Sequence, residues 1–180
     1  MGKVIQAPYN SGKIKKKSAV VAVNLIIDTR EQTPWEFDAL PSDFVINTVQ
    51  TDKLDAGDYT IVGYDLPGPD GIIIERKRGL NEINTNFGAQ WDRFMRECER
   101  LSEYGSAHII VEDDLSAAFD RYTEKYTGVN YPPAFFLKRT AQIQLRYGVQ
   151  VHYASNRRYA QYLASYLFQN HVYEDWKLDG

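Results

Sequence analysis

The stretch IIIERKRGLNEI, residues 72–83, joins three consecutive isoleucines directly to a group of charged residues. An apolar run of this kind is typical of a buried β-strand. Successive side chains of a strand point to opposite faces of its sheet, so Glu75 and Lys77 share one face and Arg76 lies on the other. Burying such charges costs free energy unless each has a partner. The stretch therefore predicts a strand that carries a charged functional site at its end.

Three more strands are expected before this one. Each is rich in apolar and β-branched residues or alternates apolar with polar ones, and they cover residues 19–27, 44–51 and 56–63. The segment DLPGPDG, residues 65–71, contains prolines and glycines that prevent regular pairing, so it is a tight connection into the strand over residues 71–77. Because no helix is expected between these four strands, they predict an antiparallel meander at one end of a sheet.

The second half of the chain alternates between helices and strands. Apolar residues recur at helical spacing over residues 91–101 and predict an amphipathic helix, which Gly105 ends. A strand, a helix, a strand and a final helix follow over residues 107–113, 134–148, 149–154 and from Ser155 or Asn156 onward. This alternation is typical of parallel strands, so the expected fold class is α/β.

The length of 180 residues is that of one domain. Residues 1–18 are rich in lysine and show no periodicity, so they are expected to form a flexible basic arm. Residues 19–180 are expected to form the single domain. The formal net charge of −3 does not exclude nucleic acid as a partner, because a local basic surface is enough to bind phosphate.

Several classes of protein are excluded by composition. No apolar run approaches the roughly 20 residues of a membrane helix, and the first residues lack the apolar core of a signal peptide. The protein is therefore expected in the cytoplasm, without a membrane partner; if the small chain is encoded by a phage, this is the host cytoplasm. The single cysteine, Cys98, excludes an internal disulfide and a zinc site with several thiolates.

Acidic residues stand at the ends of the expected strands. Asp28 ends the first strand, Asp58 opens the third, and Glu75 and Lys77 close the fourth. If these strands are neighbours, three carboxylates and one ammonium group converge, and a divalent cation relieves the repulsion between the carboxylates. Hard oxygen ligands without histidine or thiolate favour Mg²⁺ or Mn²⁺. Such a metal beside a lysine suits phosphodiester hydrolysis; the alternative interpretation is a set of surface salt bridges.

Two of these segments carry a family resemblance. GDYTI, residues 57–61, followed by IIIERK, residues 72–77, resembles the core motif of the ERCC4 (XPF/Mus81-type) structure-selective nucleases. IIDTREQ, residues 26–32, and RFMRECERL, residues 93–101, are similar to further segments of that family, and the resemblance spans roughly residues 22–170. It implies a restriction-endonuclease-like fold, a mixed β-sheet flanked by α-helices. The domain is expected to lack the helix-hairpin-helix modules of larger relatives.

The resemblance also implies roles for individual residues. It assigns the metal ligands to Asp28, Asp58, Glu75 and the main-chain carbonyl of Arg76, and it makes Lys77 the catalytic lysine. These residues together form the expected catalytic site.

Further residues are expected around that site. Arg30 and Glu31 match a pair that follows the first aspartate of the family, where they support a ligand or contact substrate, and Arg93 matches an arginine near the scissile phosphate. Two positions depart from the family pattern: Asn81 stands where an aspartate is usual, and Glu97 where a glutamine is common.

A DNA-binding surface is expected beside the site. Arg93, Arg96 and Arg100 recur on one face of the helix over residues 91–101, where they form either a ridge that contacts phosphates or an ordinary solvated face. Arg78 and Arg76 are expected to contact the DNA backbone as well, although Arg76 is also able to pair with Glu31.

The sequence therefore predicts a Mg²⁺-dependent DNA endonuclease that prefers branched, flapped or single-stranded DNA and acts in repair or recombination. The alternatives are a non-catalytic DNA-binding or dimer-partner module, a sequence-specific restriction-type endonuclease, and an RNA-directed nuclease. A homodimer through the C-terminal helix is possible, because that helix carries an apolar stripe; the alternative is a stripe that faces the core. The stripe consists of Tyr159, Tyr162, Leu163, Tyr166 and Leu167.

Overall fold

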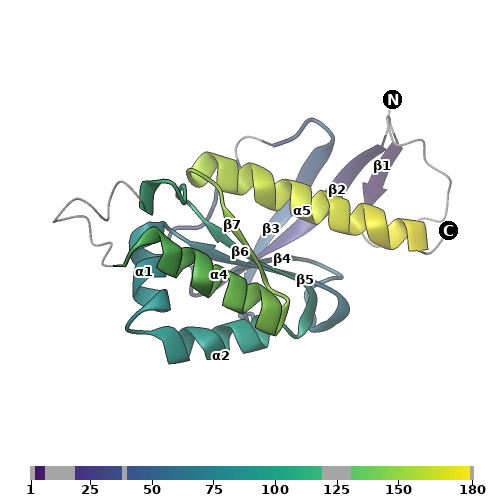
Figure 1. The fold of residues 1–180 in the computed structure, drawn as a ribbon. Helices are drawn as coiled ribbons and strands as arrows, with labels where there is room; N and C mark the ends of the chain where they lie inside the picture. The colour runs from purple at the N-terminus through teal and green to yellow at the C-terminus, as the bar shows by residue number, and fades with distance from the viewer. Residues whose placement is uncertain (1–2, 7–18, 38–39, 119–130, 179–180) are drawn as a thin grey trace.

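The computed structural model describes residues 3–6, 19–37, 40–118 and 131–178 (Figure 1). Within these residues seven strands form one sheet in the order β1-β2-β4-β5-β6-β7, and β3 pairs with β2 off this path. The strands are β1 (Lys3–Gln6), β2 (Ala19–Asp28), β3 (Phe44–Asp52), β4 (Tyr59–Ile61), β5 (Gly68–Lys77), β6 (Tyr104–Val111) and β7 (Gln150–Tyr153). The helices are α1 (Leu80–Phe87), α2 (Trp91–Leu101), α4 (Pro133–Tyr147) and α5 (Arg157–Leu178).

The sheet is mixed, which confirms the expected α/β class. Strand β4 runs antiparallel to β2 and β5, and all other pairs are parallel. The predicted antiparallel meander is therefore wrong in one strand, because β3 pairs with β2 in parallel. A parallel partner needs a long crossover, which residues 29–43 supply. Trp35 and Phe37 of this crossover are buried in the core.

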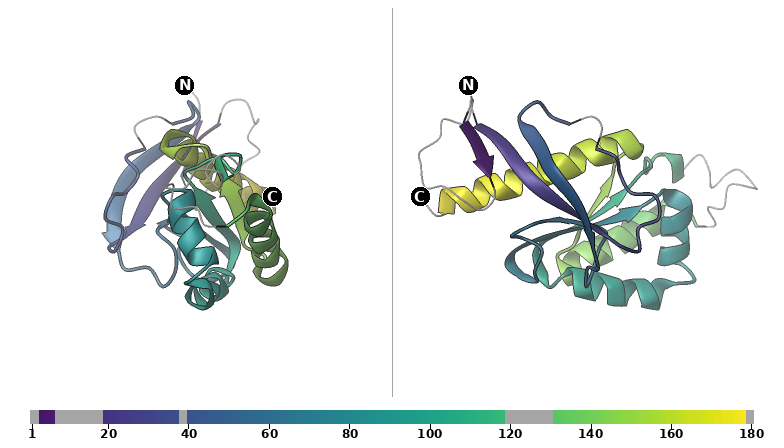
Figure 2. Two further views of the ribbon diagram at one scale, coloured as in Figure 1. Left: turned by 60° about the vertical axis from the view of Figure 1, so that its left-hand side comes forward. Right: turned by 180° about the vertical axis from the view of Figure 1, so that it is seen from behind.

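Helices cover both faces of the sheet (Figures 1 and 2). Helix α5 packs on one face through Ala160, Ala164, Phe168 and Val172. Helices α1, α2 and α4 pack on the other face. The alternation of β5 matches these layers, since Ile72 and Ile74 belong to the α5 side and Ile73 to the opposite side. The core thus holds β5 from both faces and fixes its charged end.

Three local predictions are corrected. Lys3–Gln6, expected in a flexible arm, pairs with Ala19–Ala22 of β2, while residues 7–18 lie outside the described part. Helix α1 has no counterpart in the prediction. Gly105 lies within β6 rather than ending α2. A glycine is needed there because a Cβ at this position would overlap the backbone of Pro69.

The stripe predicted on the last helix is only partly a core surface. Tyr159 and Tyr166 are exposed, whereas Leu163 and Leu167 pack partly against the core. Asn156 accepts a hydrogen bond from the Tyr159 amide (3.1 Å), which confirms the expected cap at the start of α5.

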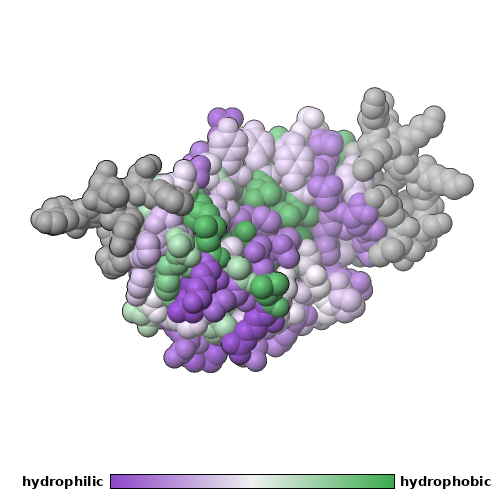
Figure 3. Space-filling view, in the orientation of Figure 1, coloured by the Kyte–Doolittle hydropathy of each residue, from purple (hydrophilic) through white to green (hydrophobic). Residues whose placement is uncertain are grey.

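The face that includes α4 and α5 is largely hydrophilic, with separate hydrophobic patches (Figure 3). Helix α4 has two exposed leucines, Leu137 and Leu145. None of the helices in the described ranges is both long enough and apolar enough to cross a membrane.

Candidate active site

The ends of β2, β4 and β5 meet at one point of the sheet. The Asp28 amide donates to the carbonyl of Asp58 (2.8 Å), and the Asp58 amide donates to the carbonyl of Ile74 (2.8 Å). Gly57 makes this turn possible: it has a φ of 68°, and a Cβ there would overlap the side chain of Ile73. The glycine before Asp58 thus lets the chain enter β4 in close contact with β5.

Asp58 lies against the backbone of β5. Its Oδ2 accepts a hydrogen bond from the Arg76 amide (2.7 Å). Burial raises the pKa of Asp58 to about 6, and the negative charges of Glu31 and Glu97 add to the rise. The Asp58 carboxylate, one of the predicted ligands, is therefore held against the backbone of β5 at Arg76.

Lys77 is held by acids from three elements. Its Nζ lies 2.6 Å from Glu75 Oε1 on β5, 2.9 Å from Glu97 Oε1 on α2 and 3.9 Å from Glu82 Oε1 on α1. Burial alone would lower the pKa of Lys77, but Glu75 and Glu97 outweigh it and hold the pKa above its ordinary value. Lys77 is therefore a fixed cation rather than a proton acceptor.

Glu75 is buried beside this lysine. Burial raises the pKa of Glu75 well above its ordinary value; Lys77 opposes the rise, and Asp58 and Glu97 add to it. The three acids of this corner, Asp58, Glu75 and Glu97, thus outnumber its one lysine, Lys77.

Asp28 is engaged by a different set of groups. Its Oδ1 accepts from the amide and Nε of Arg30, both at 2.7 Å, and its Oδ2 accepts from Arg30 Nη2 and the Leu54 amide, both at 2.8 Å. Burial alone would raise the pKa of Asp28, but these hydrogen bonds hold it below its ordinary value. The Arg30 side chain remains 61% exposed.

The opposite face of β5 carries Arg76, as the alternation predicts. Arg76 donates from Nε and Nη2 to the Glu112 carboxylate (2.8 and 3.0 Å) and from Nη1 to the Thr33 carbonyl (2.7 Å). It also lies 3.3 Å from Glu31 Oε1, so the expected pairing is present. The expectation that the Arg76 side chain contacts DNA is corrected, because it is 3% exposed.

Burial alone would raise the pKa of Glu112, but hydrogen bonds from Arg76 and Trp35 hold it below its ordinary value. Glu112 and Trp35 were not singled out from the sequence. Glu112 stands near the end of the predicted apolar strand over residues 107–113, as Glu75 stands near the end of the strand over residues 71–77. This position was the signal in the sequence that could have identified Glu112.

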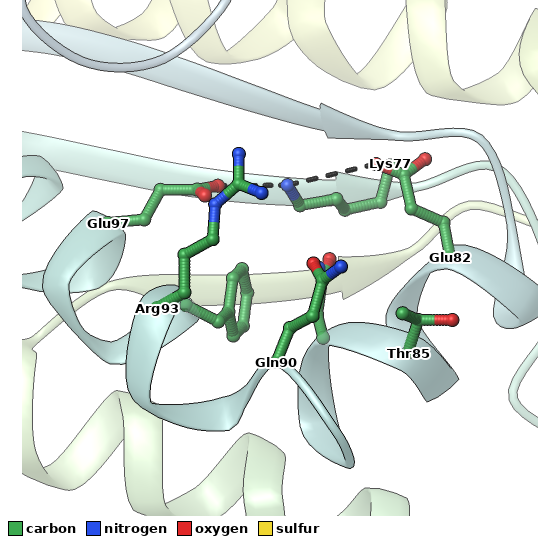
Figure 4. A pocket seen from close by; sticks show the side chains of 8 residues that line it. Lys77, Glu82, Thr85, Gln90, Arg93 and Glu97 are labelled. Atoms are coloured by element: carbon green, nitrogen blue, oxygen red, sulfur yellow. Dashed lines mark hydrogen bonds and ion pairs between the residues drawn. The ribbon is translucent and has the colours of Figure 1, made fainter.

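The remaining predicted arginines are exposed. They are Arg78, Arg93, Arg96 and Arg100. Among them, Arg93 lines a pocket together with Lys77 and Glu97 (Figure 4). Arg78 lies beyond the end of β5, 3.9 Å from Glu31.

The two departures from the family pattern have structural consequences. Asn81 is exposed in the first turn of α1, and its neighbour Glu82 turns inward, accepts a hydrogen bond from the Arg78 amide (2.9 Å) and approaches Lys77. Glu97 is a direct partner of Lys77. The lysine is thus surrounded by carboxylates supplied by both helices, α1 and α2.

Fewer residues are available to a metal ion than the sequence predicted. In the described part of the chain, no group of three or more histidine, cysteine or acidic side chains is arranged to hold one. Asp28 does not join such a group in this structure, because both of its carboxylate oxygens accept hydrogen bonds from Arg30 and Leu54. Of the predicted ligands, Asp58, Glu75 and the Arg76 carbonyl remain, and each is an oxygen donor of the kind that a hard divalent cation prefers.

Comparisons with known proteins agree with this geometry. The ERCC4 domain family model matches residues 27–166. XPF from Aeropyrum pernix has a similar fold, with a TM-score of 0.52 and 22% identity over 82% of this chain and 60% of that chain. XPF from Aeropyrum pernix in complex with DNA gives a TM-score of 0.52 and 22% identity over 86% and 66%.

The chain thus spans between 60% and 66% of the length of those structures, and at this identity the likeness concerns the fold. No curated protein matches the sequence. The family model covers most of the chain, including both the GD and the ERK segments of the site. The chain belongs to the ERCC4 domain family.

Proposed function

We propose that this domain is an endonuclease that hydrolyses DNA phosphodiester bonds with Mg²⁺ or Mn²⁺, and that it prefers branched, flapped or single-stranded DNA in repair or recombination. The observation that carries the proposal is the meeting of Asp58, Glu75 and Lys77 in one buried corner whose acids outnumber its cation. Buried charge without full compensation is characteristic of functional sites.

Asp58, Glu75 and the Arg76 carbonyl would hold the metal, which when bound neutralises a phosphate and lowers the pKa of water. Lys77 remains charged at neutral pH and would stabilise the negative charge that develops on the phosphate. Glu97 gives Lys77 a second carboxylate partner, so the lysine stays oriented when Glu75 serves the metal.

Asp28 and Arg30 would act together. Arg30 is exposed enough to exchange its carboxylate partner for a DNA phosphate. Such an exchange would free Asp28 to join Asp58 and Glu75 as the third carboxylate, as the family resemblance implies. Glu31 would support the site through Arg76 and Arg78.

The exposed arginines 78, 93, 96 and 100 would contact the DNA backbone on either side of the cut. The exposed rings of Tyr159 and Tyr166 make α5 the proposed homodimer surface. Sedimentation of wild type and of the double variant Tyr159→Ala and Tyr166→Ala tests the dimer separately from cleavage.

Cleavage of labelled single-stranded, duplex and flapped DNA tests the function. The expected result is cutting in Mg²⁺ or Mn²⁺, none in a chelator, and a faster rate on flapped DNA than on duplex. Binding without cutting on every substrate would favour the non-catalytic module. Discrete fragments from a long duplex would favour a restriction-type enzyme, and faster cutting of matched RNA would point to an RNA-directed one.

A further inference from the structure

Strand β3 forms one edge of the sheet (Figure 2). It pairs with β2 on one side, and no strand within the described ranges pairs with it on the other. Apart from β2, no described residue forms a hydrogen bond to the backbone of residues 45–51. The outward amide and carbonyl groups of β3 are therefore open to the backbone of a further strand.

Most of β3 is also exposed on both of its faces. Phe44 is buried and Ile46 packs partly against the core, but every residue from Asn47 to Asp52 is exposed. Val49 is one of them, with 57% of its surface exposed. A further strand beside this half of β3 would thus displace no described helix.

The sequence of β3 gives this edge little protection against pairing. Proteins commonly blunt an exposed edge with a short strand, a proline, a bulge or a charged side chain, above all lysine. The opposite edge follows this rule, since β7 has only four residues. Strand β3 has nine residues, FVINTVQTD, with no proline or lysine and with one charge, at its last position. Its one irregularity is the extra residue Asn47 in the ladder with β2, and its β-branched residues favour strand structure.

The charges that flank β3 indicate a second copy of this chain, in antiparallel direction, as the partner. Asp43 precedes the strand, Lys53 follows it, and both are exposed. Thr48 lies five residues from each of them, so antiparallel pairing centred on Thr48 places Asp43 of each copy opposite Lys53 of the other. Opposite charges and facing threonines are both favourable across a strand pair. Parallel pairing would instead place like charges side by side, and it would not close about a two-fold axis.

We propose that β3 is a dimer surface, at which two copies of this chain pair edge to edge and continue one sheet through both. This surface is distinct from the one proposed on α5, and it does not depend on the proposed nuclease activity. Asp52 at the end of β3 pairs with Asp28 of β2. The dimer would therefore hold its two catalytic corners at opposite ends of the shared strand pair.

Disulfide crosslinking tests this geometry. Directly opposite residues of an antiparallel pair have Cα atoms about 4.5–5.5 Å apart, a separation that a disulfide spans. The native Cys98 is buried, so it does not compete with a cysteine introduced on the edge. Thr48→Cys is expected to form a covalent dimer under mild oxidation of dilute protein. The matched control is Glu99→Cys, which changes an exposed residue of α2 and is expected to stay monomeric on a denaturing gel.

Val49→Lys tests whether the edge itself makes the contact. A lysine on an edge strand opposes pairing, and the exposed position keeps the fold, which circular dichroism checks. The double variant Thr48→Cys and Val49→Lys is expected to lose the crosslink. In the Tyr159→Ala and Tyr166→Ala background, which removes the α5 surface, sedimentation is expected to show a dimer that Val49→Lys abolishes. Val49→Thr keeps a β-branched side chain without charge and is expected to retain both the crosslink and the dimer.

Two results would overturn the proposal: crosslinking of Thr48→Cys no greater than that of Glu99→Cys, or a crosslink that survives Val49→Lys. A dimer that is lost in the Tyr159→Ala and Tyr166→Ala variant and unchanged in the β3 variants would assign dimerisation to α5 alone, and it would also contradict the proposal.

Discussion

The two faces of β5 at its charged end bury similar residues but balance their charges differently. On the α5 side, Arg76 makes a two-point contact with Glu112, and hydrogen bonds keep the pKa of Glu112 below its ordinary value. On the other side, Glu75 and Glu97 both pair with Lys77, and burial raises the pKa values of Asp58 and Glu75.

A buried ion network that satisfies its own members serves structure, because each charge already has its partner. A network with unpaired charge has a place for a further ion or substrate. We therefore infer that Arg76 and Glu112 stabilise the fold, and that the residues on the opposite face of β5 carry the chemistry. Substitutions on each face of β5 test this division of roles.

The largest expected effect is on the α5 side of β5, where Arg76 and Glu112 are paired. Arg76→Ala leaves Glu112 buried without its main partner and should lower the free energy of unfolding by about 3–5 kcal/mol. Chemical denaturation measures the loss. Arg100→Ala, which changes an exposed arginine, should lower it by less than about 0.5 kcal/mol. Equal effects of both variants would contradict a structural role for the Arg76 network.

On the other face, Asp58→Asn should reduce metal-dependent cleavage by roughly 10²–10³-fold, because it removes a charged metal ligand. The free energy of unfolding should stay equal or rise, since the substitution removes a buried negative charge. Cleavage rates, DNA affinity and denaturation are compared with wild type. Wild-type cleavage by the variant would show that this aspartate is not in the site.

A smaller effect is expected at Glu97. Glu97→Ala removes a partner of Lys77 and should lower kcat by about 10–100-fold, as loss of a supporting hydrogen bond commonly does. Glu97→Gln keeps an acceptor for Lys77 and should recover most of the rate. Neither should change KM for DNA more than twofold to threefold, as ordinary surface changes do (roughly 0.5 kcal/mol), and the exposed Glu99→Gln serves as control. An equal loss of kcat in Glu97→Ala and Glu97→Gln would show that the hydrogen bond to Lys77 does not account for the effect.

A further effect, on stability, depends on pH. Because folding raises the pKa of Asp58 from 3.8 to about 6, the ionised form destabilises the metal-free fold above that value. As the pH falls from about 6 toward 4, wild type should gain stability relative to Asp58→Asn. Thermal unfolding of both proteins in chelator measures the difference in Tm. A difference that does not change over this range would contradict the raised pKa.

Much of this division was predictable from the residues of β5. Successive side chains of a strand point to opposite faces of the sheet, so the sequence alone places Glu75 and Lys77 on one face of β5 and Arg76 on the other. The partners were not predictable by the same means, because Glu97 and Glu112 come from α2 and β6, and only tertiary packing brings them to β5.

Other misses have local causes. Helix α1 contains asparagines and a threonine, which have weak helix propensity, although its apolar residues Leu80, Ile83 and Phe87 do follow helical spacing. The parallel course of β3 depends on how residues 29–43 cross the fold, which strand patterns do not encode. Asp28 stands at a strand end as predicted, but the bond to Arg30 two residues later depends on the turn that follows the strand.

Calorimetric titration of Mn²⁺ into wild type and Asp58→Asn tests the central claim most directly, because it needs no DNA and no cleavage. The account predicts binding to wild type at pH 7.5 and loss of that binding in the variant. Absence of binding to wild type, or identical binding by both proteins, would contradict the assignment of this acid cluster to a cation site.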